Sequence, residues 1–282
     1  MKTGLVLEGG AMRGLFSAGI TDVMMEHGIS VDGILGVSAG AAFGCNYKSN
    51  QPGRAVRYNV NYARDPRYCS IRSLLFTGNI YGADFCYHEL PDKLDLFDAD
   101  TFAASPMEFY VTCTDVLTGE PVYRKLDHAD YDDLEWIRAS ASMPLVSRIV
   151  EVGGRKMLDG GIADSIPLRY FQSIGYDRNI VVLTQPRGYT KSKNSMLPVI
   201  RQVYRKYPKL IDAIARRHEM YNATLEYLWQ EEKRGNTLIL CPDENLPIDR
   251  IEHDPDKLRT VYSIGRKHAE DRLEEIREFR NA

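Results

Sequence analysis

The stretch GILGVSAGAAFG occupies residues 33–44 and places one serine, Ser38, among small residues on both sides. The apolar run 33–37 predicts a buried strand, and the small residues after Ser38 can form a helix. A sharp turn between the two needs small residues two positions from the serine, where Gly36 and Gly40 stand. The G-x-S-x-G pattern therefore predicts a strand, turn and helix that expose the serine oxygen. A tight turn packed with small residues, without a catalytic role, fits the same pattern.

The residues before this stretch extend the pattern into an α/β fold. Residues 4–7 predict a buried strand that runs into a glycine loop at 9–14, and residues 12–27 have helical spacing up to Gly28. Strand, loop, helix, strand, turn and helix in this order favour a mainly parallel sheet covered by helices.

Further elements continue to the end of the chain. We expect strands at 108–115, 121–126, 179–185 and 237–242, a hairpin that turns at Gly153-Gly154, a short helix over 166–175, helices over 54–64, 132–142, 195–234 and 255–280, and irregular structure over 65–105. No repeat or low-complexity linker interrupts them. We therefore expect a single domain over 1–282, with a core at about 4–185 and a helical part at about 190–282.

The composition narrows the function classes. A formal charge of -3 over 282 residues and an ordinary apolar content do not fit a nucleic-acid-binding or a disordered protein. Five scattered cysteines without a C-x-x-C pair indicate a reducing compartment. The first apolar run is too brief for a signal peptide, and no run approaches the length of a membrane span. These features predict a cytoplasmic protein.

The loop GGAMRG at residues 9–14 follows the first predicted strand and opens a helix, so it has three interpretations. It can be a dinucleotide-binding loop with Asp32 as the acidic partner, although Ala11 stands where that pattern needs its middle glycine. It can be an oxyanion hole for an intermediate formed at Ser38, since neighbouring parallel strands bring both loops to one sheet edge. It can also be a plain strand–helix turn.

A nucleophilic serine needs a proton acceptor, and none of the six histidines stands in a turn of small residues, so we expect them on the surface. The better candidate is Asp159 in KMLDGGIADSIP, at the end of a predicted hairpin strand and next to Gly160 and Gly161. The aspartate can equally cap its own turn. A Ser–Asp pair without histidine is workable at a separation of about 3 Å.

Taken together, EGGAMRG (8–14), GVSAG (36–40) and LDGG (158–161) resemble the patatin-like phospholipase family, and the tract 138–168 resembles its bacterial members throughout. The resemblance extends over about residues 4 to 185. It implies a three-layer α/β/α fold, Ser38 as nucleophile and Asp159 as proton acceptor. It further implies an oxyanion hole from Gly9 to Gly14, with Gly10 and Ala11 as the N–H donors and Arg13 at the family's basic position. The chain departs from the family at Ala11, where a third glycine is usual.

The resemblance implies a serine hydrolase that cleaves carboxylic esters of lipids through an acyl-enzyme, without a metal or cofactor. An acyltransferase with the same dyad is the nearest alternative, and a nucleotide-binding domain using residues 9–14 and Asp32 is the alternative from another class. From Arg187 to Arg217 the chain has nine Lys or Arg and one acid, Asp212, interleaved with apolar residues. Such a stretch can lie on an anionic membrane surface, or it can be a core-packed helix with a solvated basic face.

Overall fold

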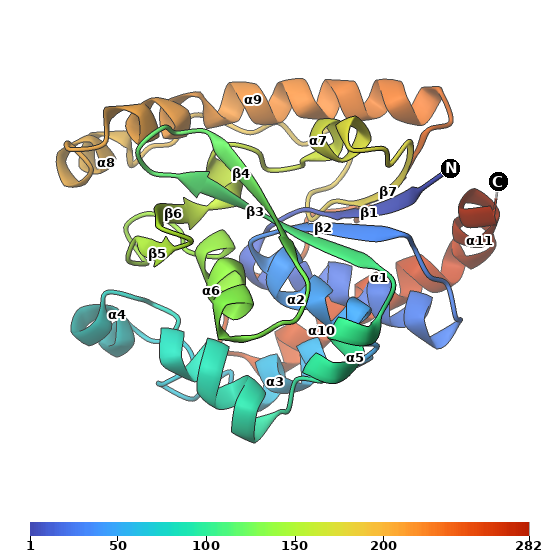
Figure 1. Cartoon of the computed structure of the whole chain (residues 1–282), viewed down its shortest axis with the longest axis horizontal. Coiled ribbons are helices and arrows are strands. Elements are labelled where there is room, and N and C mark those ends of the chain that lie inside the picture. The colour runs from blue at the N-terminus through green and yellow to red at the C-terminus, as the bar shows by residue number, and fades with distance from the viewer. Residues whose placement is uncertain (282) are drawn as a thin grey trace.

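A sheet of eight strands runs through the middle of the molecule, with helices on both faces (Figure 1). The computed structural model describes residues 1–281. The strand order is β5-β6-β3-β2-β1-β7-β8, and β4 pairs with β3 outside this path. The strands are β1 (Thr3–Leu7), β2 (Gly33–Val37), β3 (Glu108–Asp115), β4 (Pro121–Leu126), β5 (Val150–Val152), β6 (Arg155–Asp159), β7 (Arg178–Val182) and β8 (Thr237–Leu240).

The centre of the sheet is parallel. β1 pairs in parallel with β2 and β7, and β2 with β3, whereas β4, β5 and β6 join through antiparallel pairs. β1 and β2 are buried along their whole length, which explains their continuous apolar runs. The predicted mainly parallel α/β fold is confirmed.

Two helical layers cover this sheet. Below it in Figure 1 lie α1 (Gly14–Glu26), α2 (Ala39–Lys48), α3 (Arg54–Asn61), α5 (Ala99–Ala104), α6 (Tyr131–Ser140) and α10 (Pro255–Asp271). Above it lie α7 (Leu168–Ser173) and α9 (Pro208–Lys233). Leu5 and Leu7 belong to the lower core and Val6 to the upper one, since successive strand residues point to opposite faces.

The prediction of irregular structure over residues 65–105 is wrong. This region contains α4 (Ile71–Thr77), the π-helical segment η2 (Phe85–Leu94) and α5. The side chains of Ser70 and Asp98 cap α4 and α5 by accepting backbone N–H bonds. These helices are short and one holds Pro91, so their apolar periodicity is weak in the sequence.

The two long predicted helices of the C-terminal third are each divided. Residues 195–234 form α8 (Leu197–Val203) and α9, and the break precedes Pro208, which takes the first position of α9. Residues 255–280 form α10 and α11 (Leu273–Asn281), which meet at Arg272.

α10 packs against α1 through a glycine on each helix. A Cβ atom on Gly19 would lie 2.3 Å from the Tyr262 carbonyl oxygen, and one on Gly265 would lie 2.0 Å from the Phe16 carbonyl oxygen. The C-terminal third is thus built onto the sheet's lower helical layer by α10 and onto its upper face by α9. None of the helices within residues 1–281 has the length and apolar character that crossing a membrane requires.

Candidate active site

Ser38 lies in the turn between β2 and α2. Its backbone has φ 56° and ψ −121°, a left-handed conformation that costs a non-glycine residue on the order of 1–3 kcal/mol. A Cβ atom on Gly36 would lie 2.6 Å from the backbone of Ala41, and one on Gly40 would lie 2.3 Å from the Leu7 carbonyl oxygen. The backbone passes so closely here that both positions require glycine. The helix α2 begins directly after the serine and points its amino end at the site.

Two hydrogen bonds through Ser140, which the sequence did not predict, connect this turn to β3. The Ser38 N–H donates to the Ser140 hydroxyl at 2.9 Å, and that hydroxyl donates to the Thr112 carbonyl oxygen at 2.7 Å. Ser140 ends α6 and Thr112 belongs to β3. The RASAS tract around Ser140 gives no periodic signal for this contact, because the contact depends on how α6 crosses the sheet.

The glycine loop lies against the serine. A Cβ atom on Gly9 would be 2.7 Å from the Ser38 Cβ, and one on Gly10 would be 2.5 Å from the Thr184 hydroxyl. Within residues 1–281 the N–H groups of Gly9 and Gly10 have no hydrogen-bond acceptor. The loop therefore brings free amide donors beside the serine, which is the arrangement an oxyanion hole needs.

Ala11 and Arg13 form the one-turn helix η1 (Ala11–Arg13) that follows these glycines. Ala11 has φ 51°, so the alanine occupies a backbone conformation that favours glycine. Gly14 packs on α2, where a Cβ atom would lie 2.8 Å from that of Ala39. The Nε atom of Arg13 is buried without a hydrogen-bond partner within residues 1–281.

Asp159 ends β6 opposite Cys113 of β3. Gly160 must be glycine, since its Cβ atom would lie 2.0 Å from the Thr112 carbonyl oxygen. The Gly161 N–H donates to the Asp159 carboxylate at 2.8 Å. The aspartate therefore caps the turn that follows it and at the same time faces the serine.

The structure brings Asp159 and Ser38 together, and both side chains are almost wholly buried, at 4% and 8% exposure. Burial raises the pKa of the Asp159 carboxyl, and the charge of Arg217, a hydrogen bond from Ser38 and the Gly161 N–H partly offset that rise. A partly desolvated carboxylate that faces a hydroxyl can accept its proton.

The histidines lie apart from this pair. No histidine within residues 1–281 forms a hydrogen bond with Ser38 or Asp159. The expectation that all are surface residues is wrong for His88, His218 and His268. The side chains of His88 and His218 are 19% and 14% exposed, and the Nε2 atom of His268 is buried. His88 bonds Glu135 at 3.1 Å, so its burial has a structural partner.

Asp32, the acidic residue of the dinucleotide interpretation, does not reach the glycine loop. It precedes β2 and accepts the Thr3 N–H at 2.7 Å, at the amino end of β1. The glycine loop follows the carboxyl end of β1. Asp32 and the glycine loop therefore lie at opposite ends of the strands. Dinucleotide binding needs the acidic residue beside the glycine loop, and the structure does not place Asp32 there.

An apolar pocket lies beside Ser38, among the helices of the lower layer. Its wall is formed by α2, α3, η2 and α6, with Ala11 of the glycine loop at the end near the serine. Most of its lining side chains are aliphatic or aromatic and include Met12, Phe43, Tyr58, Tyr87, Leu90, Leu134 and Ile137. A hydrocarbon chain attached to a carbonyl group at Ser38 fits such a lining.

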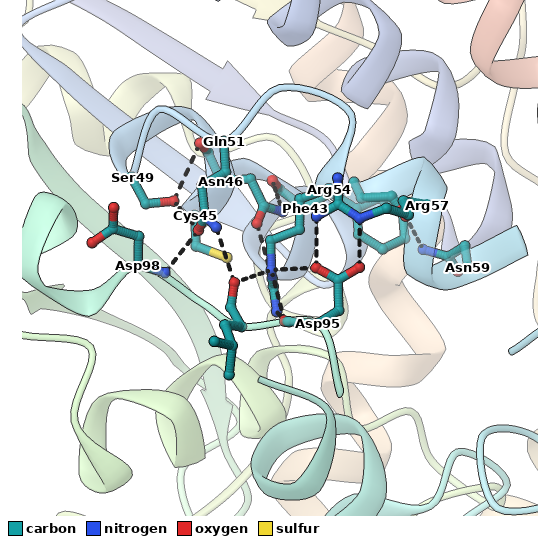
Figure 2. Close-up of polar contacts among 12 residues, drawn as sticks. Phe43, Cys45, Asn46, Ser49, Gln51, Arg54, Arg57, Asn59, Asp95 and Asp98 are labelled. Atoms are coloured by element: carbon teal, nitrogen blue, oxygen red, sulfur yellow. Dashed lines mark hydrogen bonds and ion pairs between the residues drawn. The ribbon is translucent and has the colours of Figure 1, made fainter. Parts of the chain in front are cut away.

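A buried arginine, Arg54, lines part of this pocket. Figure 2 shows its polar contacts. Arg54 of α3 donates to the Asn46 side chain at 3.0 Å, to the Leu96 carbonyl oxygen at 3.2 Å and to the Asp95 carbonyl oxygen at 3.1 Å. The Asp95 carboxylate lies 3.3 Å from the Arg54 Nε and also accepts two hydrogen bonds from Arg57. This network ties α2 and α3 to the segment after η2. No cluster of three or more potential metal ligands occurs among residues 1–281.

In the basic stretch 187–217, some side chains pack in a core and others are exposed. Its interleaved apolar side chains pack in a core of their own with β6 and η3 (Gly160–Ile162), where Ile200, Tyr204 and Ile214 are buried. They are therefore unable to face a membrane. Arg187 pairs with Glu232 at 2.8 Å. Other apolar residues, Met196, Val199 and Val203, are exposed around α8.

Comparison with known proteins identifies the family of this chain. A model described as patatin-like phospholipase matches residues 5–171, and a model described as a domain of unknown function (DUF6363) matches residues 207–281. The uncharacterized protein YjjU of Escherichia coli K12 is 30% identical over 190 residues, covering 66% of this chain and 52% of that protein. Lysophospholipase nte1 of Aspergillus terreus is 26% identical over 300 residues, covering 98% of this chain and 18% of that protein.

Among solved structures, VipD from Legionella pneumophila matches with a TM-score of 0.47 and 11% identity, covering 97% of this chain and 67% of that one. This chain spans about half the length of the Escherichia coli relative and far less of the fungal one. The patatin-like model covers more than half of the chain, and its range holds the glycine loop, the serine turn and Asp159. The chain therefore belongs to the patatin-like phospholipase family.

Proposed function

We propose that this chain is a serine hydrolase that cleaves carboxylic esters of lipids, of the phospholipase A or lysophospholipase type, with Ser38 as nucleophile and Asp159 as base. The observation that carries the proposal is a strained, buried serine that faces a buried carboxylate and lines an apolar pocket. A strained nucleophile, a positioned base and a hydrocarbon-lined pocket are the parts that lipid ester hydrolysis needs.

The reaction begins when the Ser38 oxygen attacks the ester carbonyl carbon and its proton passes to Asp159. The N–H groups of the loop 9–14, chiefly those of Gly10 and Ala11, stabilise the negative oxygen of the tetrahedral intermediate, while Arg13 adds positive charge nearby. The C–O bond of the alcohol part then breaks, and that oxygen takes the proton from Asp159. The acyl chain, seated in the apolar pocket, remains as an ester on Ser38.

In the second half, water attacks the acyl-enzyme carbonyl and gives its proton to Asp159. The Ser38 oxygen leaves with that proton, and the fatty acid is released. Removal of one oxyanion donor typically costs about 3 kcal/mol in the transition state. The N–H groups of the loop therefore contribute to the rate in addition to the dyad. An alcohol that replaces water in this step gives acyl transfer, which uses the same residues.

The substrate lies in membranes, and we further propose that the surface around α8 contacts an anionic lipid surface. Exposed Met196, Val199 and Val203 stand beside the exposed cations Arg201 and Arg205. Apolar side chains that can enter the headgroup region next to cations favour such contact. Replacing Val199 and Val203 together by Ser should lower binding to phosphatidylglycerol vesicles in a sedimentation assay.

The decisive experiment is a hydrolysis screen over phospholipids, lysophospholipids and acylglycerols, with Ser38→Ala and Asp159→Asn beside the native chain. We expect Ser38→Ala to abolish hydrolysis and the reaction with a fluorophosphonate probe, and Asp159→Asn to lower kcat at least a thousandfold, on the order of 4 kcal/mol. Ser173→Ala, at an exposed serine of α7, is the matched control and should leave both unchanged. Full activity of Ser38→Ala refutes the proposal, and labelled alcohol acceptors separate hydrolysis from transfer.

A further inference from the structure

A buried glutamate, Glu8, joins the glycine loop to the C-terminal third of the chain. Glu8 directly follows β1 and precedes Gly9, and its N–H donates to the Val182 carbonyl oxygen at 3.0 Å. The residue is 4% exposed. A carboxylate withdrawn from water needs hydrogen-bond donors in place of the water that it loses. The groups that donate to Glu8 therefore help to fix the start of the loop.

Two residues supply these donors to the Glu8 carboxylate. Thr184 donates its backbone N–H at 2.6 Å, and its hydroxyl lies 3.1 Å from the same carboxylate oxygen. Tyr221 donates its hydroxyl to the other carboxylate oxygen at 2.7 Å. Hydrogen bonds to an ionised acceptor are roughly twice as strong as those between neutral groups. The carboxylate is therefore held at both of its oxygens.

Both donors lie outside the range 5–171 that the patatin-like model matches. Thr184 follows β7, and Tyr221 lies in the middle of α9, within the segment 207–281 that matches the domain of unknown function. Burial raises the pKa of the Tyr221 hydroxyl, and the charge of Glu8 raises it further, so the hydroxyl keeps its proton at neutral pH and remains a donor. Helix α9 thus reaches the glycine loop through one buried tyrosine.

Thr184 also fixes the direction of the first peptide unit of the loop. Its hydroxyl lies 3.1 Å from the Gly9 carbonyl oxygen, so its single proton is shared between that oxygen and Glu8. The Gly9 carbonyl and the Gly10 N–H belong to one planar trans peptide unit and point in opposite directions. The Gly10 N–H therefore points to the side away from Thr184, where it has no acceptor within residues 1–281.

We propose that Tyr221 and Thr184 are positioning residues, which hold this first peptide unit so that its N–H faces an oxyanion formed at the catalytic serine. Tyr221 acts through Glu8, and Thr184 acts both through Glu8 and directly on the peptide. This inference rests on the proposed hydrolase function and gives the segment of unknown function a task in it. An oxyanion donor is effective only at about 3 Å from the oxygen in the transition state, so a displaced loop lowers kcat more than it changes KM.

The first test separates catalysis from binding in the hydrolysis of p-nitrophenyl butyrate. Tyr221→Phe removes the donor and keeps the ring, and we expect kcat to fall about tenfold or more while KM changes by less than about twofold. Thr184→Val should lower kcat at least as much, because it removes the shared proton. Thr184→Ser keeps the hydroxyl, and its kcat should stay within about twofold of the native value.

Tyr227→Phe is the matched control, because it also removes one tyrosine hydroxyl of α9. The Tyr227 hydroxyl donates to the Gln172 side chain at 2.6 Å, and Gln172 belongs to α7 rather than to the glycine loop. We therefore expect kcat of this variant to stay near the native value. The proposal is overturned by an equal fall of kcat in Tyr221→Phe and Tyr227→Phe, by an effect confined to KM, or by a Thr184→Ser variant as slow as Thr184→Val.

The second test observes the Gly10 N–H itself and does not depend on hydrolysis. In protein labelled with ¹⁵N- and ¹³C-carbonyl glycine, an HNCO spectrum selects the second residue of each Gly-Gly pair, which in this sequence means Gly10, Gly154 and Gly161. We expect the Gly10 signal to shift in Tyr221→Phe and to stay in Tyr227→Phe. The signal of Gly154, in the turn between β5 and β6, should stay in both variants.

The two tests have separate outcomes. A Gly10 signal that stays in place in Tyr221→Phe refutes the positioning role even if the chain hydrolyses esters. A shifted signal in a chain that hydrolyses no ester supports the hold of α9 on the loop and refutes only the proposed function. Thr184→Val decides the spectroscopic test in the same way if Tyr221→Phe does not fold.

Discussion

Replacing Arg54 by Met should strongly destabilise the fold, because it breaks the buried network behind the apolar pocket (Figure 2). The Arg54 side chain is 4% exposed and bonds the Asn46 side chain and two backbone carbonyl oxygens. Its guanidinium carbon also lies 5.4 Å from the ring centroid of Tyr58 and 5.2 Å from that of Phe97.

The magnitude follows from what the variant leaves behind. Removal of one partner of a buried ion pair typically costs 3–5 kcal/mol. The Asp95 carboxylate keeps two hydrogen bonds from Arg57, at 2.7 and 2.8 Å, so its own charge stays paired. The unpaired groups are then the Asn46 oxygen and the backbone carbonyls, and we expect the free energy of unfolding to fall by about 3 kcal/mol.

Arg57→Met is the matched control because Arg57 binds the same carboxylate from a side chain that is 50% exposed. In that variant Arg54 still neutralises Asp95, and we expect a loss of at most about 1 kcal/mol. Urea unfolding of both variants, followed by circular dichroism, gives the two values. Equal losses in the two variants, or a loss below about 1 kcal/mol for Arg54→Met, would refute the reasoning that burial decides the energy.

Three further predictions concern the site. Burial raises the pKa of Asp159, so the native state holds this proton more tightly than the unfolded state and loses stability as pH rises from about 4 to the native pKa. Asp159→Asn should therefore raise Tm more at pH 8 than at pH 4, and an equal gain at the two pH values would contradict this. The charge of Arg217 lowers the same pKa, so Arg217→Gln should move the acidic limb of kcat/KM to higher pH, as a pH–rate profile measures. Ala11→Gly relieves a left-handed alanine and should stabilise the chain by about 0.5–1 kcal/mol in urea unfolding, and a loss of stability would contradict this.

Much of the fold is local enough to be predicted. The runs 4–7 in β1, 33–37 in β2 and 180–182 in β7 are apolar because both faces of a central parallel strand are buried, so the sequence pattern and the structure agree there. The turn at Gly153-Gly154 is likewise visible, since both glycines have positive φ angles in a two-residue hairpin loop. Residues 65–105 were mispredicted because short capped helices and the π-helical η2 bury only scattered side chains.

The candidate site likewise contains residues that the sequence pattern predicts and one that it does not. The serine turn, the glycine loop and the aspartate with its two glycines are readable because close backbone approach demands small residues at fixed spacing, as at Gly36, Gly40 and Gly160. Ser140, which supports the serine turn, carries no such mark. Its role depends on where α6 crosses β3, which spacing along one segment does not encode.

The amino-acid sequence by itself determined the α/β core and marked Ser38 and Asp159 as candidates, through glycines that the backbone geometry makes obligatory. The tertiary structure alone decided which charged residues of the C-terminal third lie near the candidate site. Basic residues occur all along the stretch 187–217, yet Arg187 pairs with Glu232 whereas Arg217 lies beside Asp159. A charge acts through the distances to its neighbours in space, and those distances arise only when α9 packs over the sheet and carries its arginine to the end of β6.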